Sequence, residues 1–162
     1  MSYELHPEAP PEGVKLAERF RGRDMAPFYE NLKVRGSELG IVFNPHILLS
    51  NSRKALLASE YARDMGRYGA FHENMFSAYL TKSQDIGLDV VIAAVAQESG
   101  LDPDETLAAV GDGRYDSRLA DAIRAGRQLG LTGIPLFVIN DKYKITGAQP
   151  LEIFRDLLGK IK

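Results

Sequence analysis

Near its C-terminus the chain places a proline directly in front of an apolar run. Residues 132–140 read Thr-Gly-Ile-Pro-Leu-Phe-Val-Ile-Asn, and Gly130 precedes them. A short apolar run between turn residues is typical of a buried strand, predicted here at Leu136–Asn140. A second strand is predicted at Tyr143–Thr146. The two would form a hairpin with a two-residue turn at Asp141-Lys142.

Most of the chain before this hairpin has the spacing of amphipathic helices. The clearest start is Asp102-Pro103-Asp104-Glu105, with Asp as N-cap, Pro at the first helical position and Glu three residues after the cap. A short strand is predicted at Tyr3–Leu5, ahead of the proline-rich residues 8–13. The other helices are predicted over residues 25–39, 51–68 with a stop at Gly69, 70–80, 88–98 and 115–129. A last helix runs from Pro150 to Leu158, with Leu151, Phe154, Leu157 and Leu158 as its buried face.

Charge and composition exclude several classes of function. The net charge is -2 with mixed signs, so no basic stripe for nucleic acid is present. No apolar stretch reaches the roughly 18 residues of a membrane span, and the first residues do not resemble a signal peptide. We therefore expect a soluble, cytoplasmic protein with no membrane or nucleic-acid partner.

The chain contains no cysteine, which removes disulfides, thiolate metal sites and thiol nucleophiles. Its three histidines, His6, His46 and His72, have no helical i, i+4 partner and no nearby carboxylate set. We expect no metal site, no cofactor and no catalytic residue in this sequence.

Two C-terminal motifs and several helical segments together resemble one known family. The motifs are residues 133–139, Gly-Ile-Pro-Leu-Phe-Val-Ile, and 145–150, Ile-Thr-Gly-Ala-Gln-Pro. The helical segments are Asn51–Ala55 and Phe71–Tyr79, followed by Asp85-Ile86-Gly87. Nearly the whole chain is similar to DsbA-like proteins of the thioredoxin fold, and within them to the dithiol–disulfide oxidoreductase/isomerase group called FrnE-like.

The resemblance implies an α/β chain with an incomplete thioredoxin-like fold and a large helical insertion. Residues 1–13 would be a remnant of the second thioredoxin strand and a linker. Residues 14–130 would be the insertion, and residues 131–162 the C-terminal ββα unit. In such proteins a strand, a Cys-x-x-Cys and a helix come before the segment that opens this chain. We expect the absence of these three elements to have one of three origins. The gene model or cloned fragment is shortened, the protein is a degenerate paralogue, or the start codon is assigned after an in-frame interruption.

The resemblance also implies which residues bind substrate. The Ile134–Pro135 bond would be cis, and Gly133, Ile134 and Pro135 would present backbone groups to an extended substrate. The partner would be a thiol-bearing protein or peptide, or glutathione. Without the cysteine pair the chain would be inactive in thiol exchange, because that reaction needs a thiolate.

Two other functions stay open at this point. One is a redox-dead module that only binds peptides beside Pro135. The other is a relative of kappa-class glutathione transferases and 2-hydroxychromene-2-carboxylate isomerases, whose serine would also lie on the first helix. In all cases the strand at Leu136–Asn140 would keep an unpaired edge, which favours a homodimer.

Overall fold

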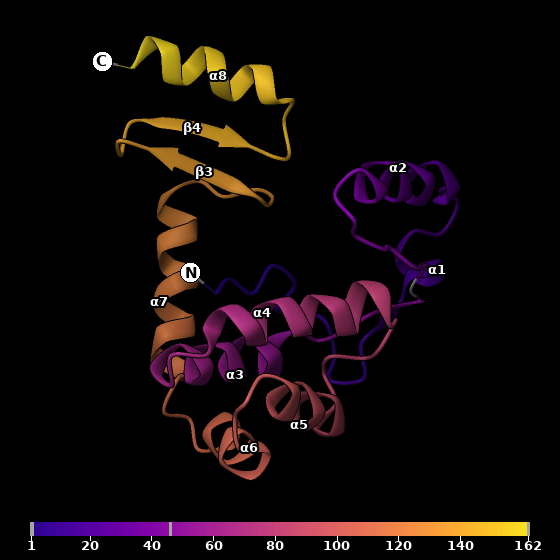
Figure 1. Cartoon of the computed structure of the whole chain (residues 1–162), viewed down its shortest axis with the longest axis vertical. Helices are drawn as coiled ribbons and strands as arrows, with labels where there is room; N and C mark the ends of the chain where they lie inside the picture. Colours follow the sequence, from indigo (N-terminus) through magenta and orange to yellow (C-terminus); the bar gives the residue numbers. More distant parts are fainter. Residues whose placement is uncertain (1, 46, 162) are drawn as a thin grey trace. The chain divides into compact units, whose positions relative to one another are not determined.

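The computed structural model describes residues 2–45 and 47–161, and it divides into two compact units (Figure 1). Unit 1 is Met1–Ala122 and unit 2 is Ile123–Lys162. The division falls inside one helix, α7 (Asp116–Gln128).

Unit 1 is largely helical. It opens with β1 (Val14–Lys15) and α1 (Leu16–Arg19), followed by α2 (Ala26–Ser37) and β2 (Leu48–Leu49). Four further helices follow in order: α3 (Arg53–Asp64), α4 (Tyr68–Phe76), α5 (Asp89–Glu98) and α6 (Pro103–Gly111). One turn of π-helix, η1 (Ser77–Thr81), extends α4. The first part of α7 completes the unit.

The core of unit 1 forms around α3, which packs against α4, α5 and α6. On α3 the buried positions include Ala55, Ala58 and Ala62, whose small side chains let the neighbouring helices approach closely. Phe71 of α4 and Ile92 of α5 fill the space opposite them, and neither is exposed. Apolar burial of this kind supplies most of the stabilisation of a domain.

The start of α6 is the one that the sequence predicts. Asp102 is the N-cap, and its Oδ1 accepts a hydrogen bond from the Glu105 amide at 2.9 Å.

The predicted helix stop at Gly69 is wrong. The helix ends at Asp64, and Gly66 takes the left-handed conformation with φ of +68°. Gly69 instead lies inside α4, because a residue in the left-handed region ends a helix whatever the apolar spacing beyond it.

The N-terminal segment has no strand at Tyr3–Leu5, contrary to our expectation. Its polar side chains anchor it to α3 instead: Ser2 donates to Glu60, and buried Glu4 forms an ion pair with Arg53 at 3.3 Å. A two-stranded antiparallel ladder, which the helical spacing did not predict, joins β1 to β2. Strands of two residues are too short to leave a periodic signal.

Unit 2 contains the predicted hairpin and closing helix. β3 (Leu136–Ile139) pairs antiparallel with β4 (Tyr143–Thr146), and Phe137 lies opposite Ile145. The turn differs from the prediction by one residue. Asn140 and Asp141 take φ of 51° and 53°, and the Lys142 amide donates to the Ile139 carbonyl. Asn and Asp tolerate positive φ better than Lys, which explains the position of the turn.

The closing helix α8 (Leu151–Lys160) lies beside the hairpin (Figure 1). Phe154 packs edge-on against Phe137, with the ring centroids 4.9 Å apart. The predicted buried face is only partly correct. Phe154 and Leu157 are half-buried, but Leu151 is 57% exposed and Leu158 is 56% exposed. A two-stranded hairpin is narrower than the apolar face of this helix.

No helix formed by the described residues is long and apolar enough to cross a membrane.

Candidate functional site

The predicted binding residues Gly133, Ile134 and Pro135 lie in the loop between α7 and β3. Ile134 is 57% exposed, although its side chain is large and apolar. The Ile134–Pro135 peptide bond is cis. The loop therefore places an exposed apolar residue two positions before Leu136, the first residue of β3.

A second loop holds this one in place. The Gly147 amide donates to the Pro135 carbonyl at 2.8 Å. Gly147 has φ of +83°, a conformation that favours glycine. The Gln149 side chain then donates to the Thr146 carbonyl at 2.9 Å, which fixes the turn into α8. The two sequence motifs thus meet through backbone contacts.

The register of the hairpin determines which backbone groups of β3 remain unpaired. In an antiparallel ladder, residues alternate between those that bond to the partner strand and those whose backbone groups point away. The bond from Gly147 to Pro135 assigns Phe137 and Ile139 to the bonded set. The amides and carbonyls of Leu136 and Val138 therefore point away from β4.

We call this side of the strand the free edge of β3, meaning Ile134, Leu136 and Val138. Among the described residues β3 pairs with β4 alone. The sequence analysis identified Ile134 but missed Leu136 and Val138. Their role depends on strand parity, which follows from the register and not from residue type.

The strand is held firmly on its other sides. Phe137 contacts Phe154 of α8, and its backbone bonds to β4. On β4, the Lys144 ammonium donates to the Leu129 carbonyl at 2.7 Å, beside the end of α7. A strand fixed in this way presents its free edge with little conformational freedom to lose on binding.

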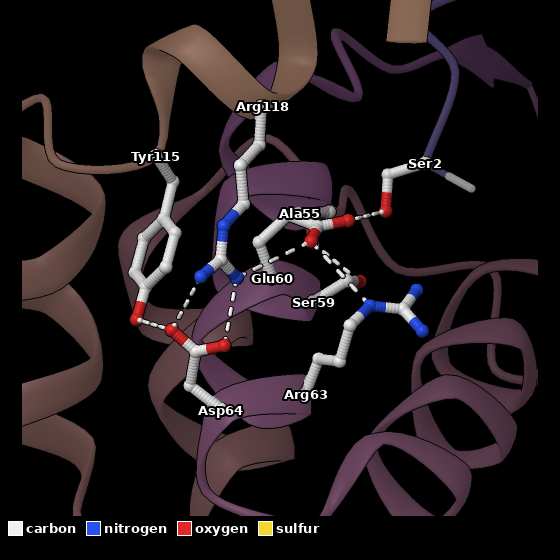
Figure 2. Close-up of polar contacts among 8 residues, drawn as sticks. All are labelled: Ser2, Ala55, Ser59, Glu60, Arg63, Asp64, Tyr115 and Arg118. Atoms are coloured by element: carbon white, nitrogen blue, oxygen red, sulfur yellow. Dashed lines mark hydrogen bonds and ion pairs between the residues drawn. The ribbon is translucent and has the colours of Figure 1, made fainter. Parts of the chain in front are cut away.

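A second cluster of functional groups lies in unit 1 and is shown in Figure 2. Arg118 makes two hydrogen bonds to Asp64, at 2.7 and 2.9 Å, and Tyr115 donates to the same carboxylate at 3.1 Å. The hydrogen bonds from Arg118 lower the pKa of Asp64. Burial, followed by the bond to Asp64, raises the pKa of Tyr115.

The neighbouring Glu60 carboxylate also has hydrogen-bond and ion-pair partners. It accepts from Ser2 at 2.5 Å and lies 3.4 Å from Arg63 and 3.7 Å from Arg118 (Figure 2). Both carboxylates of the cluster, Glu60 and Asp64, are charge-paired with arginines of the cluster. We interpret the cluster as the connection that joins the N-terminal segment and the start of α7 to α3.

Of the two histidines that the structure describes, neither belongs to a metal-binding cluster. His6 contacts Glu8 at 3.1 Å, and the His72 ring lies between Tyr68 and Phe76. The expectation for His46 concerns a residue outside the described ones. In residues 2–45 and 47–161, no three metal-ligating side chains of His, Cys, Asp or Glu gather closely enough to hold an ion.

Comparisons with known proteins give one consistent result. A sequence model of the family described as "DSBA-like thioredoxin domain" matches residues 2–159. The fold is similar to the crystal structure of a probable DsbA oxidoreductase from Streptomyces coelicolor, with a TM-score of 0.86 and 22% identity. That similarity covers 98% of this chain and 74% of the other. A search of curated proteins found no match.

Proposed function

The chain belongs to the family of DSBA-like thioredoxin domains, and we propose that it binds an extended, thiol-bearing peptide along the free edge of β3. The observation that supports this most directly is the unpaired backbone of Leu136 and Val138, next to exposed Ile134. An extended segment added to such an edge gains main-chain hydrogen bonds, and side-chain contacts supply its specificity.

Binding and thiol chemistry are separate in this chain. Thiol–disulfide exchange begins with a thiolate attacking a disulfide sulfur, and none of the 162 residues is a cysteine. We therefore propose that the chain supplies the peptide-binding part of a disulfide oxidoreductase or isomerase domain and does not itself exchange disulfides. An insulin-reduction assay with dithiothreitol should give the rate of the protein-free control. A rate above that control would refute this part of the proposal.

The same edge explains an expected homodimer. Two copies can pair their β3 edges about a two-fold axis, because antiparallel pairing of identical strands is self-complementary. We propose that the dimer forms when no peptide is bound and that a peptide competes with it. A monomer in light scattering, with fast amide exchange at Leu136 and Val138, would contradict the dimer.

The binding test uses proline to block the edge. Val138→Pro removes an amide that faces the free edge and leaves the bonds of Phe137 and Ile139 to β4 intact. Thr146→Pro is the matched control, because its amide faces the opposite edge of the hairpin. Nuclear magnetic resonance titration with an extended cysteine peptide, its serine counterpart and reduced glutathione measures the affinity of each variant.

We expect the wild-type amides at Ile134, Leu136 and Val138 to shift with either peptide, since main-chain pairing does not require the thiol. Val138→Pro should weaken binding about fivefold, because a single net hydrogen bond contributes about 1 kcal/mol. Thr146→Pro should bind as the wild type does. Equal affinities for wild type and Val138→Pro would refute the assignment of the edge.

A further inference from the structure

Unit 1 contains a cavity of about 650 Å³ between η1, the end of α4 and the segment Gly40–Phe43. It lies wholly within unit 1 and is independent of the free edge of β3. Cavities of this size accommodate small organic molecules. One wall comes from the segment after α2, and the other from the α4–η1 helix.

The wall formed by the segment is built into the fold. Thr81 donates from its hydroxyl to the Val42 carbonyl at 2.7 Å. The Asn44 amide donates to the Leu80 carbonyl at 2.9 Å, and the Asn44 side chain donates to the Thr81 carbonyl at 2.6 Å. The carbonyls at the end of the π-helical turn thus hold the segment. Single π-helical turns occur frequently at functional sites.

Large apolar side chains on both walls of this cavity remain exposed. Ile41 is 45% exposed, Val42 58% and Phe76 52%. Three such residues around one hollow differ from the scattered apolar residues of an ordinary surface. The Phe76 ring meets the His72 ring edge-on at 4.7 Å, so one wall carries aromatic surface. These contacts favour an aromatic or branched apolar ligand.

A carboxylate determines the charge that such a ligand should carry. Glu73 lines the same cavity and is exposed, and it has no cationic partner within the described part of the chain. Lys82, just beyond the cavity, is already paired with Glu98. An ammonium group would therefore meet an available carboxylate, and it would also be attracted by the face of Phe76.

We propose that this cavity binds a small aromatic or branched apolar molecule that carries one ammonium or guanidinium group. The apolar part lies against Ile41, Val42 and Phe76, and the cation lies beside Glu73. Neither the comparisons nor the free edge of β3 assigns a ligand to this part of the chain. The proposed binding is reversible and involves no covalent change in the ligand.

The test compares three probes of nearly equal size at pH 7: 2-phenylethylamine, the neutral 2-phenylethanol and the anion 3-phenylpropionate. Nuclear magnetic resonance titration locates the shifted amides and gives each affinity. We expect saturable shifts at residues 40–43 and 72–81. The amine should bind about fivefold more tightly than the alcohol, since an exposed ion pair and a cation–π contact are each weak. The anion should bind least.

Two variants separate the contributions, and a third is the control. Glu73→Gln should reduce the preference for the amine over the alcohol from about fivefold to about twofold, the part that the Phe76 ring supplies, with the affinity for the alcohol unchanged. Phe76→Ala should weaken both probes. Glu152→Gln, an exposed substitution of the same kind on α8, should change neither affinity. Unchanged amide spectra elsewhere establish that each variant is folded. Absent saturable shifts at the cavity, or an amine preference that stays undiminished in Glu73→Gln, would refute the proposal.

Discussion

Gly36 and Gly69 provide a sharp test of packing, because the same substitution should have opposite effects at the two positions. Both glycines lie in helices of unit 1, Gly36 near the end of α2 and Gly69 near the start of α4. A Cβ atom added at Gly36 would lie 2.6 Å from the Ile41 carbonyl oxygen and 2.6 Å from the Phe43 ring. A Cβ atom at Gly69 would meet nothing within 4 Å.

The expected magnitudes follow from two terms. Replacing helical glycine by alanine stabilises a helix by roughly 0.5–1 kcal/mol, and both variants gain this term. Overpacking costs about 1–3 kcal/mol and applies only to Gly36→Ala, because the close atoms there include a backbone carbonyl. We expect Gly36→Ala to lose about 1 kcal/mol and Gly69→Ala to gain about 0.7 kcal/mol. For a chain of this size the two melting temperatures should differ by about 3–7 °C.

Urea unfolding and thermal melting of the wild type and both variants measure the difference. Because the propensity term is shared, the difference between the variants isolates the contact of α2 with the segment after it. The same contact positions one wall of the cavity, so Gly36→Ala should also shift the amides of Ile41 and Phe43. The reasoning is refuted if Gly36→Ala is as stable as Gly69→Ala, or if both variants are more stable than the wild type.

Three further outcomes are expected. Asp102→Ala removes the N-cap of α6 and should lower the free energy of unfolding by about 1 kcal/mol, as measured by urea denaturation. Asp64→Asn should lose stability at neutral pH. Because Arg118 lowers the folded pKa of Asp64 below its ordinary value of 3.8, this stabilisation is present above pH 3.8 and is lost as the pH falls through the folded pKa. Unfolding curves of wild type and Asp64→Asn should therefore converge in acid, and a gap constant with pH would contradict the role of this carboxylate. Asp141 has positive φ and follows Asn140, so Asp141→Gly would place an Asn-Gly pair in the turn of the hairpin. This substitution should stabilise the hairpin by about 0.5 kcal/mol, measured as slower amide exchange in β3 and β4.

The elements that the sequence predicts well have strong local signals. The N-cap and proline at the start of α6 determine that helix from four adjacent residues. The strand β4 has the predicted bounds, because apolar and polar residues alternate within it and turn residues flank it on both sides. The helix predicted over residues 70–80 forms as α4 and η1, and it buries Phe71 and Met75, which are four residues apart. In each case neighbouring residues carry the information.

The features that the sequence did not predict depend on contacts between distant residues. The N-terminal segment lacks its expected strand, and side chains 49 and 58 residues away anchor it to α3. The π-helical turn η1 has no characteristic residue pattern that distinguishes it from an α-helix. Its Thr81 carbonyl accepts a hydrogen bond from the distant Asn44 side chain. The cavity beside it is formed by two segments that no motif connects. A single sequence gives no direct evidence of such pairings.

The free edge of β3 also could not be predicted from residue types. It consists of backbone amides and carbonyls, and the side chains of Leu136 and Val138 do not show which backbone groups are unpaired. Position along the strand determines their availability: β4 uses the backbone of Phe137 and Ile139, and α8 holds the Phe137 ring. Fixing alternate residues makes the remaining ones rigid, and a rigid edge loses little entropy when a second strand joins it. The helix on one face of β3 and the paired strand on one side thus favour the proposed binding at this edge. A substitution that loosens the Phe137–Phe154 contact should therefore weaken peptide binding without touching the peptide. Phe154→Ala tests this, with binding and β3 amide exchange measured together. Binding that stays at the wild-type level while β3 exchange rises would show that rigidity of the edge is not required.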